Sequence, residues 1–257
     1  TAIAGGTVLS LADVEAADAG AYTVVVSNAL GSATSRAATL TLRGRSYAGS
    51  YFGSFGNGGL PAGAGSFALT VRDDNTGVFL GYAAGSRPAL SSVEGTAFVS
   101  RDIAIDDNGR FRLVTVASTS PSEASGAEAL AKAAAAANEF IIDGAIGTDG
   151  SLAGSVSALS TSLTGTRSSA TGAAQSVAGF YQSGAAGSSA TTYTIVSPAG
   201  QAFVLAVTPT STDGGTGTVD ATGRISVTTA NNATVAGTLS ASSATLTATV
   251  TTAAGTK

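Results

Sequence analysis

The chain has no cysteine, methionine, tryptophan or histidine among its 257 residues. Without cysteine there are no disulfides and no thiol chemistry, and the additional lack of histidine excludes the common zinc sites and histidine-based catalysis. Carboxylates, Ser, Thr, Tyr and Lys remain as possible catalytic groups, but a Ser without an adjacent base is inert and neither Lys lies in a recognisable motif. We therefore predict no metal, no cofactor, no catalytic residue and no enzymatic activity; a cleft in which two carboxylates converge would favour an enzyme instead. Because methionine is absent as well, we interpret the sequence as an internal or processed piece of a longer protein.

Charged side chains are also scarce. They make up 11% of the chain, against about 25% in ordinary globular domains. With a net charge of −4 the chain offers no basic patch, so nucleic acid is excluded as a partner. It has no signal peptide and no apolar run of about 18 residues or more, so we predict no membrane insertion within this chain. A surface of Ser, Thr and Gly without cysteine favours an exported bacterial protein, extracellular or on the cell surface.

A hairpin pattern occurs twice, at residues 105–111 and 219–225. Each copy reads apolar, Asp, two turn residues, Gly, Arg, apolar. The Asp side chain is expected to accept backbone N–H bonds, and the Gly to take the left-handed conformation that closes the turn. Because similar strand patterns surround each copy, we predict two diverged β-units, residues 46–167 and 176–257, joined by a flexible linker at 168–175.

Each unit is expected to be a small antiparallel barrel or sandwich of five to seven strands, since small residues alternate with Val, Leu and Ile between turn signals. One stretch interrupts this pattern. Residues 122–137 are rich in alanine, the best helix former, and Ser125 with Glu128 fits a capping box. We predict a helix there, inserted in the first unit.

The N-terminal stretch contains Asp18, Gly20 and Tyr22 in an Asp-x-Gly-x-Tyr run between alternating apolar segments. This resembles the last three strands (E, F and G) of an immunoglobulin-like domain of the intermediate set, with Tyr22 at the tyrosine corner. The resemblance implies that residues 1–42 are half of a sandwich whose other strands lie upstream. It departs from the family at Val24, where a disulfide cysteine would be expected, so packing would replace the bridge.

Two adjacent acidic pairs, Asp73 with Asp74 and Asp106 with Asp107, raise the question of carboxylate catalysis. Neighbouring residues on a turn point apart, whereas a glycosidase needs two facing carboxylates about 5 to 9.5 Å apart. The loop after Asp106 also lacks the alternating acidic residues and the distant Glu of a calcium loop. We therefore predict that both pairs form turns.

Aromatic residues supply the remaining candidate site. Glycan-binding modules use exposed aromatic faces as stacking platforms, but alternating aromatic residues more often belong to a core. Neighbouring aromatic residues on a strand face opposite sides, so one of each neighbouring pair is a candidate for exposure. The candidate ligand-binding residues are Tyr47, Tyr51, Phe52, Phe180 and Tyr181.

The sequence thus predicts a mainly β chain: a partial immunoglobulin-like sandwich followed by two repeated antiparallel β-units and one inserted Ala-rich helix. The leading functional hypothesis is a non-enzymatic structural or adhesive segment of a secreted or cell-surface multidomain bacterial protein. Its partners would be surface glycans or other cell-surface proteins. The alternative is a carbohydrate-binding accessory region of a secreted polysaccharide-degrading enzyme, and exposed aromatic residues at the positions above would favour it.

Overall fold

A computed structural model of the chain describes residues 8–11, 14, 16–41, 44–56, 65–83, 96–116, 139–157, 160–184, 191–207, 212–240, 245–252 and 255–256. The helix predicted at residues 122–137 lies outside these ranges. The chain divides into two compact units, Thr1–Arg45 and Ser46–Lys257. No helix in the described ranges is both long and apolar enough to cross a lipid bilayer.

The first unit contains two small antiparallel ribbons and one short 3₁₀ turn, η1 (Ala16–Asp18). Strand β1 (Gly20–Tyr22) pairs with β4 (Ala38–Leu40), and β2 (Val25–Asn28) pairs with β3 (Gly31–Thr34). The Tyr22 hydroxyl donates a hydrogen bond to the carbonyl oxygen of Asp18, four residues upstream. Most apolar side chains described in this unit are exposed, among them Val8, Val24, Val25, Val26 and Leu30.

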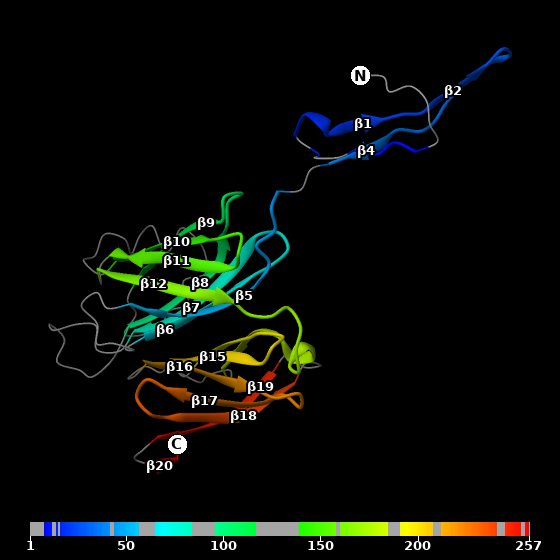
Figure 1. The fold of residues 1–257 in the computed structure, drawn as a ribbon. Helices are drawn as coiled ribbons and strands as arrows, with labels where there is room; N and C mark the ends of the chain where they lie inside the picture. The colour runs from blue at the N-terminus through cyan, green and yellow to red at the C-terminus, as the bar shows by residue number, and fades with distance from the viewer. Residues whose placement is uncertain are drawn as a thin grey trace. The chain divides into compact units, whose positions relative to one another are not determined.

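The second unit contains two eight-stranded antiparallel sheets (Figure 1). The strands of sheet 1 are β5 (Gly49–Phe55), β6 (Gly65–Val71), β7 (Thr76–Ala83), β8 (Thr96–Ala104), β9 (Arg110–Val116), β10 (Glu139–Ile146), β11 (Ser151–Val156) and β12 (Thr161–Arg167). Those of sheet 2 are β13 (Gly179–Ser183), β14 (Thr191–Val196), β15 (Gln201–Val207), β16 (Thr212–Val219), β17 (Arg224–Thr229), β18 (Thr234–Ser240), β19 (Thr245–Thr252) and β20 (Gly255–Thr256). Strands that follow each other in sequence are neighbours throughout sheet 2, whereas in sheet 1 the consecutive strands β8 and β9 are not paired and β5 pairs with β12. Each sheet curls into a nearly closed barrel. With eight strands, each sheet also exceeds the five to seven strands predicted from the sequence.

The predicted turns are confirmed in both sheets, but only the second closes a hairpin, because β16 and β17 are paired whereas β8 and β9 are not. Gly109 and Gly223 have φ angles of 78° and 81°, the left-handed conformation that the turn requires. The Asp106 carboxylate accepts the backbone N–H of Arg110 at 2.8 Å, and Asp220 accepts that of Arg224 at 3.0 Å. The two turns therefore form by the same side-chain-to-backbone bonds.

The interior of each barrel is filled by inward-facing apolar side chains. In sheet 1 they include a group of aromatic rings, with Phe55 and Phe79 each within 5.6 Å of Phe67 between ring centroids. In sheet 2 the side chains are smaller and mostly Val, Ala and Leu. The stretch predicted as a flexible linker is attached to both sheets: the Ser168 N–H donates to the Ser50 carbonyl at 2.7 Å, and that of Ala174 to the Pro198 carbonyl at 3.1 Å. A 3₁₀ turn, η3 (Gln175–Val177), then leads into β13.

The two sheets are open at different places. Sheet 1 is continuous through the β12–β5 pair, and its unpaired ends are β8 and β9. In sheet 2 the corresponding strands β16 and β17 are paired, and the unpaired ends are β13 and β20. Glycine explains the closed pair in sheet 2, because a Cβ atom at Gly215 or Gly217 would lie 2.1 Å from a carbonyl oxygen of β17. By ladder register the equivalent residues of β8 are Ser100 and Ile103, which are not glycines.

Candidate functional site

The five aromatic residues predicted as a ligand site do not form one platform. Tyr47, Tyr51 and Tyr181 are buried, with 4%, 1% and 6% of their surfaces exposed. The Tyr51 hydroxyl donates to the Tyr47 carbonyl at 2.7 Å, and the Tyr181 hydroxyl donates to the Val177 carbonyl at 2.7 Å. Burial also raises the pKa of both hydroxyls above the ordinary tyrosine value. These three residues are part of the barrel walls, which corrects the prediction that they offer a stacking surface.

Phe52 and Phe180 have a different environment. Each is half-buried and faces away from the interior of its own barrel, and both pack against an apolar cluster that the two sheets share. The sequence rule that neighbouring aromatic residues face opposite sides therefore holds at Tyr51 with Phe52 and at Phe180 with Tyr181. The outward residue of each pair contributes to contact between the sheets rather than to an open surface.

The shared cluster is the most extensive feature of the described residues that joins the two sheets. It is built from outward-facing side chains of β6, β7, β8, β14 and β15: Ala68, Val78, Leu80, Tyr82, Ala97, Tyr193, Ile195, Phe203, Leu205 and Val207. Because these side chains are covered, β7 and β15 are buried on both faces and their sequences read as continuous apolar runs. That unbroken run was the signal in the sequence from which this interface could have been predicted.

Equivalent outward-facing positions of the two sheets contribute to the shared cluster. Gly49 pairs with Val71, which pairs with Gly77, and the equivalent chain in sheet 2 is Gly179, Val196 and Ala202. Counting from these residues, the outward positions of β6 and β7 correspond one to one with those of β14 and β15. The matching sets are Ala68, Val78, Leu80 and Tyr82 in sheet 1, and Tyr193, Phe203, Leu205 and Val207 in sheet 2. Similar faces of the two sheets therefore pack on each other.

Polar contacts surround this apolar interface. The Asn231 side-chain amide donates to the Tyr82 hydroxyl at 3.2 Å, which links the β17–β18 turn to β7. Arg101 on β8 donates to the side chain of Gln182 on β13. A Cβ atom added at Gly214 would lie 2.7 Å from the Tyr82 Cβ atom, so only glycine allows this close approach of β16 to β7.

Asp213 lies next to this contact and holds the β17–β18 turn in place. Its carboxylate accepts the Thr229 hydroxyl at 2.5 Å and the Gly214 N–H at 2.9 Å. Burial raises the pKa of Asp213 above the usual aspartate value, although hydrogen bonds from Thr229, Asn231 and Gly214 act in the opposite direction. By contrast, the exposed Asp220 has a lowered pKa, chiefly because the Thr222 hydroxyl donates to its carboxylate.

These two carboxylates should affect stability with opposite dependence on pH. A raised pKa in the folded chain gives a stabilising contribution that is present below the unfolded pKa of about 4 and is lost as pH rises through the folded pKa. Wild type should therefore lose stability relative to Asp213→Asn as pH rises above about 4. A lowered pKa gives a stabilising contribution that is lost as pH falls below about 4. Wild type should therefore lose stability relative to Asp220→Asn as pH falls below about 4. Urea unfolding of the three proteins from pH 3 to 7 measures both, and slopes of the same sign would contradict the assignment.

Two shallow grooves occupy equivalent positions on the outer surface of the barrels. One has a volume of about 510 Å³ and includes Asp106, Arg110 and Gly144; the other, about 330 Å³, includes Asp220, Arg224 and Gly237. The carboxylates of Asp106 and Asp220 accept hydrogen bonds from their own turns. In the first groove the exposed side chains of Arg112 and Asp143 form an ion pair at 3.7 Å. In the part of the chain that the structure describes, no cluster of three or more Asp, Glu, His or Cys residues could hold a metal ion.

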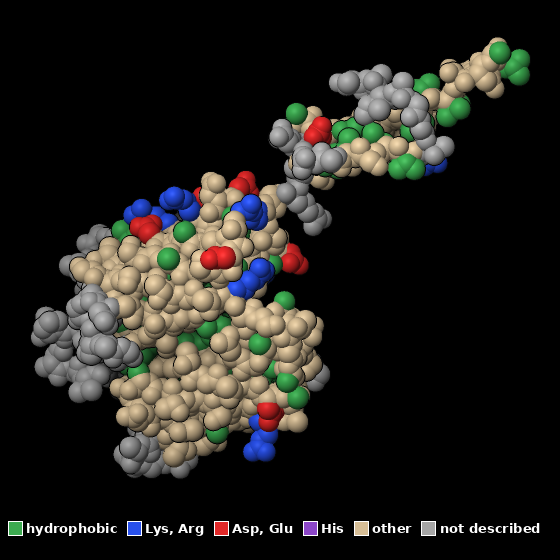
Figure 2. Space-filling model, in the orientation of Figure 1, with side chains coloured by type: hydrophobic (Ala, Val, Ile, Leu, Met, Phe, Trp, Pro, Cys, Tyr) green, Lys and Arg blue, Asp and Glu red, His purple; other side chains and the backbone are tan. Residues whose placement is uncertain are grey.

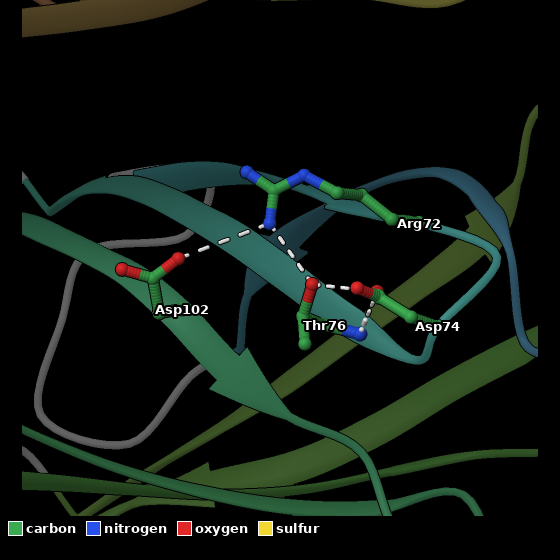
Figure 3. Close-up of polar contacts among 4 residues, drawn as sticks. All are labelled: Arg72, Asp74, Thr76 and Asp102. Carbon is green, nitrogen blue, oxygen red and sulfur yellow. Dashed lines mark hydrogen bonds and ion pairs between the residues drawn. The ribbon is translucent and has the colours of Figure 1, made fainter.

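The acidic pairs form turns, as predicted from the sequence. In the β6–β7 turn the Asp74 carboxylate accepts both the N–H of Thr76 at 2.9 Å and its hydroxyl at 2.6 Å (Figure 3). The same pair of bonds joins Asp149 to Ser151 and Asp220 to Thr222. These carboxylates shape hairpins and do not converge on a common point.

Taken together, the described residues define a mainly β protein with two similar, nearly closed antiparallel sheets that share one apolar interface. Comparison of the chain with protein families, with curated proteins and with solved structures gave no match.

Proposed function

We propose that this chain is a non-enzymatic structural segment of a secreted or cell-surface multidomain bacterial protein, in which residues 46–257 act as a rigid double-barrel spacer. The observation that carries the proposal is the apolar interface between the sheets. Leu80, Phe203 and Leu205 are outward-facing yet completely buried. Burying one such side chain is worth about 1.5–3 kcal/mol, so the whole cluster opposes a hinge motion between the barrels.

The surface of the second unit supports the same proposal. Its visible face is largely uncharged, and most of its charged side chains gather on sheet 1, with very few on sheet 2 (Figure 2). Polar, uncharged side chains keep such a module soluble without creating a strong field for charged ligands. Tight turns with Asp and Gly also limit the exposed flexible backbone on which proteases act.

We also propose that the two sheets are diverged copies of one repeated unit, and that residues 1–42 are the E to G strands of an immunoglobulin-like domain. The equivalent turns and outward positions support the repeat. The bond from Tyr22 to the Asp18 carbonyl supports the tyrosine corner. The exposed Val24 and Val26, which alternation places on one side of the chain, are consistent with a face that further strands of such a domain would cover.

Pulsed electron–electron double resonance, which measures the distance between two spin labels, tests the rigid spacer directly. Because the chain has no native cysteine, Ser162→Cys on β12 and Ser226→Cys on β17 introduce two exposed labelling sites, one per barrel. We expect a single narrow distance distribution, as narrow as that of a reference pair placed within sheet 1 by Arg112→Cys and Ser162→Cys. A broad distribution only for the pair that spans both barrels would show independent barrels and overturn the proposal. Antibody staining of intact cells of the source organism tests the surface location separately.

A further inference from the structure

An arginine on the interface has contacts that set it apart from the surrounding side chains. Arg101 is exposed on β8 of sheet 1, but its guanidinium carbon lies 5.8 Å from the ring centroid of Phe180 and 5.7 Å from that of Tyr193. Both rings belong to sheet 2 and stack nearly parallel, with 6.5 Å between centroids and an interplanar angle of 15°. The same guanidinium donates to the Gln182 side chain. One cation therefore contacts three side chains of the other barrel.

The backbone directs Arg101 toward sheet 2 through a β-bulge. Between Gly77 and Phe79 on β7, the partner strand advances from Ile103 to Ser100, so β8 contains one extra residue. Asp102, next to Arg101, has a φ of 61°, a left-handed conformation that aspartate adopts more readily than most residues other than glycine. In sheet 2 the corresponding position of β16 is the single residue Thr216. The contact thus depends on an inserted residue that the similar sheet lacks.

The other residue of the bulge, the exposed Asp102, contacts a side chain of its own sheet. The Asp102 carboxylate lies 3.9 Å from the Arg72 guanidinium, which also donates to the Thr76 hydroxyl at 2.9 Å (Figure 3). Thr76 is in turn bonded to Asp74 in the β6–β7 turn. Exposed ion pairs such as Arg72 with Asp102 are individually weak, but this chain of contacts connects the bulge to the β6–β7 turn and so supports its conformation.

We propose that Arg101 is a positioning residue that fixes the orientation of the second barrel on the first. The apolar cluster supplies most of the attraction between the barrels, but apolar contact is non-directional. A guanidinium held over two rings and bonded to Gln182 has a restricted geometry, because cation–π contact requires the cation over the ring faces and the hydrogen bond requires alignment. This role rests on the proposed rigid spacer and explains how the spacer acquires one defined angle.

The test uses the full chain with the labels at Ser162 and Ser226. Arg101→Met removes the charge and the donors while keeping a long side chain, and Arg101→Lys keeps the charge without the planar fork. Arg112→Met is the matched control, since Arg112 is an exposed arginine whose ion pair with Asp143 lies within sheet 1. We expect the population outside the wild-type distance peak to rise about tenfold in Arg101→Met, which corresponds to about 1.4 kcal/mol. Arg101→Lys should be intermediate, and Arg112→Met should match wild type.

The outcomes separate this proposal from the one on which it rests. A broad distribution in the wild type overturns the rigid spacer itself. A narrow wild-type distribution that stays unchanged in Arg101→Met overturns the positioning role and leaves the spacer intact. Thermal unfolding of each variant distinguishes orientation from stability, because a purely stabilising role would lower the unfolding temperature of Arg101→Met without broadening the distances in its folded state.

Discussion

Replacing Gly215 with valine is expected to open sheet 2 between β16 and β17. A Cβ atom at this position would lie 2.1 Å from the Thr228 carbonyl oxygen and 2.6 Å from the Thr229 Cα atom, so the new side chain would collide with backbone that cannot rotate away. We expect a loss in the free energy of unfolding at the upper end of the range for overpacking, about 3 kcal/mol. Urea unfolding followed by far-UV circular dichroism measures the loss.

Thr216→Val provides the matched control for this substitution. It introduces the same side chain on the neighbouring residue of β16, which is exposed. Valine is favourable in strands, so the control should unfold close to the wild type. If Gly215→Val also unfolded close to the wild type, the close approach of β16 and β17 would not be required for the fold.

The second large effect is expected in the core of sheet 1. Phe67 is completely buried, its ring stacks on that of Phe79 at 5.4 Å between centroids, and its tip lies over the bare backbone of Gly53 and Gly165. Phe67→Ala should leave a cavity that the rigid barrel cannot fill and should cost about 3–5 kcal/mol. That is a large part of the about 5–15 kcal/mol that stabilises a typical protein.

Phe52→Ala is the comparison for this core substitution, because it removes the same ring from a neighbouring strand of sheet 1 on its outer face. Phe52 is only half-buried against the shared cluster, so its loss should cost clearly less. Chemical denaturation of both variants with a common baseline makes the comparison. Equal losses would mean that the aromatic group inside the barrel is not better packed than the interface.

The elements that sequence predicted well are those with a local cause. The Asp-x-x-Gly-Arg turns form as expected because an Asp side chain and a glycine with positive φ determine the turn within a few residues. Whether the flanking strands then pair is not local, since β16 and β17 are paired but β8 and β9 are not. The mainly β class follows from alternating small and β-branched residues for the same reason. The strand number was predicted too low, at five to seven instead of eight per sheet, and the barrel opening was not predicted. Both depend on contacts between strands distant in sequence, such as the close approach of β17 at Gly215 and Gly217.

The aromatic ligand site was predicted wrongly for a different reason. Strand alternation indicates that Tyr51 and Phe52 face opposite sides but does not say which side is covered, because that depends on a second sheet distant in sequence. The buried position of Tyr51 is marked locally only by the hydrogen bond to a carbonyl four residues earlier, which Tyr181 repeats. Arg101 has no signal in the sequence at all, since its role arises from a bulge that a single chain pattern does not reveal.

The packing of similar faces between the two sheets limits how further barrels could be added to them. When equivalent surfaces meet, each member satisfies the other and neither retains a free surface of that kind. A head-to-tail contact would instead leave one face open at each end and allow unlimited growth. Because these faces of residues 46–257 are already buried against each other, a further barrel would have to join them through another surface.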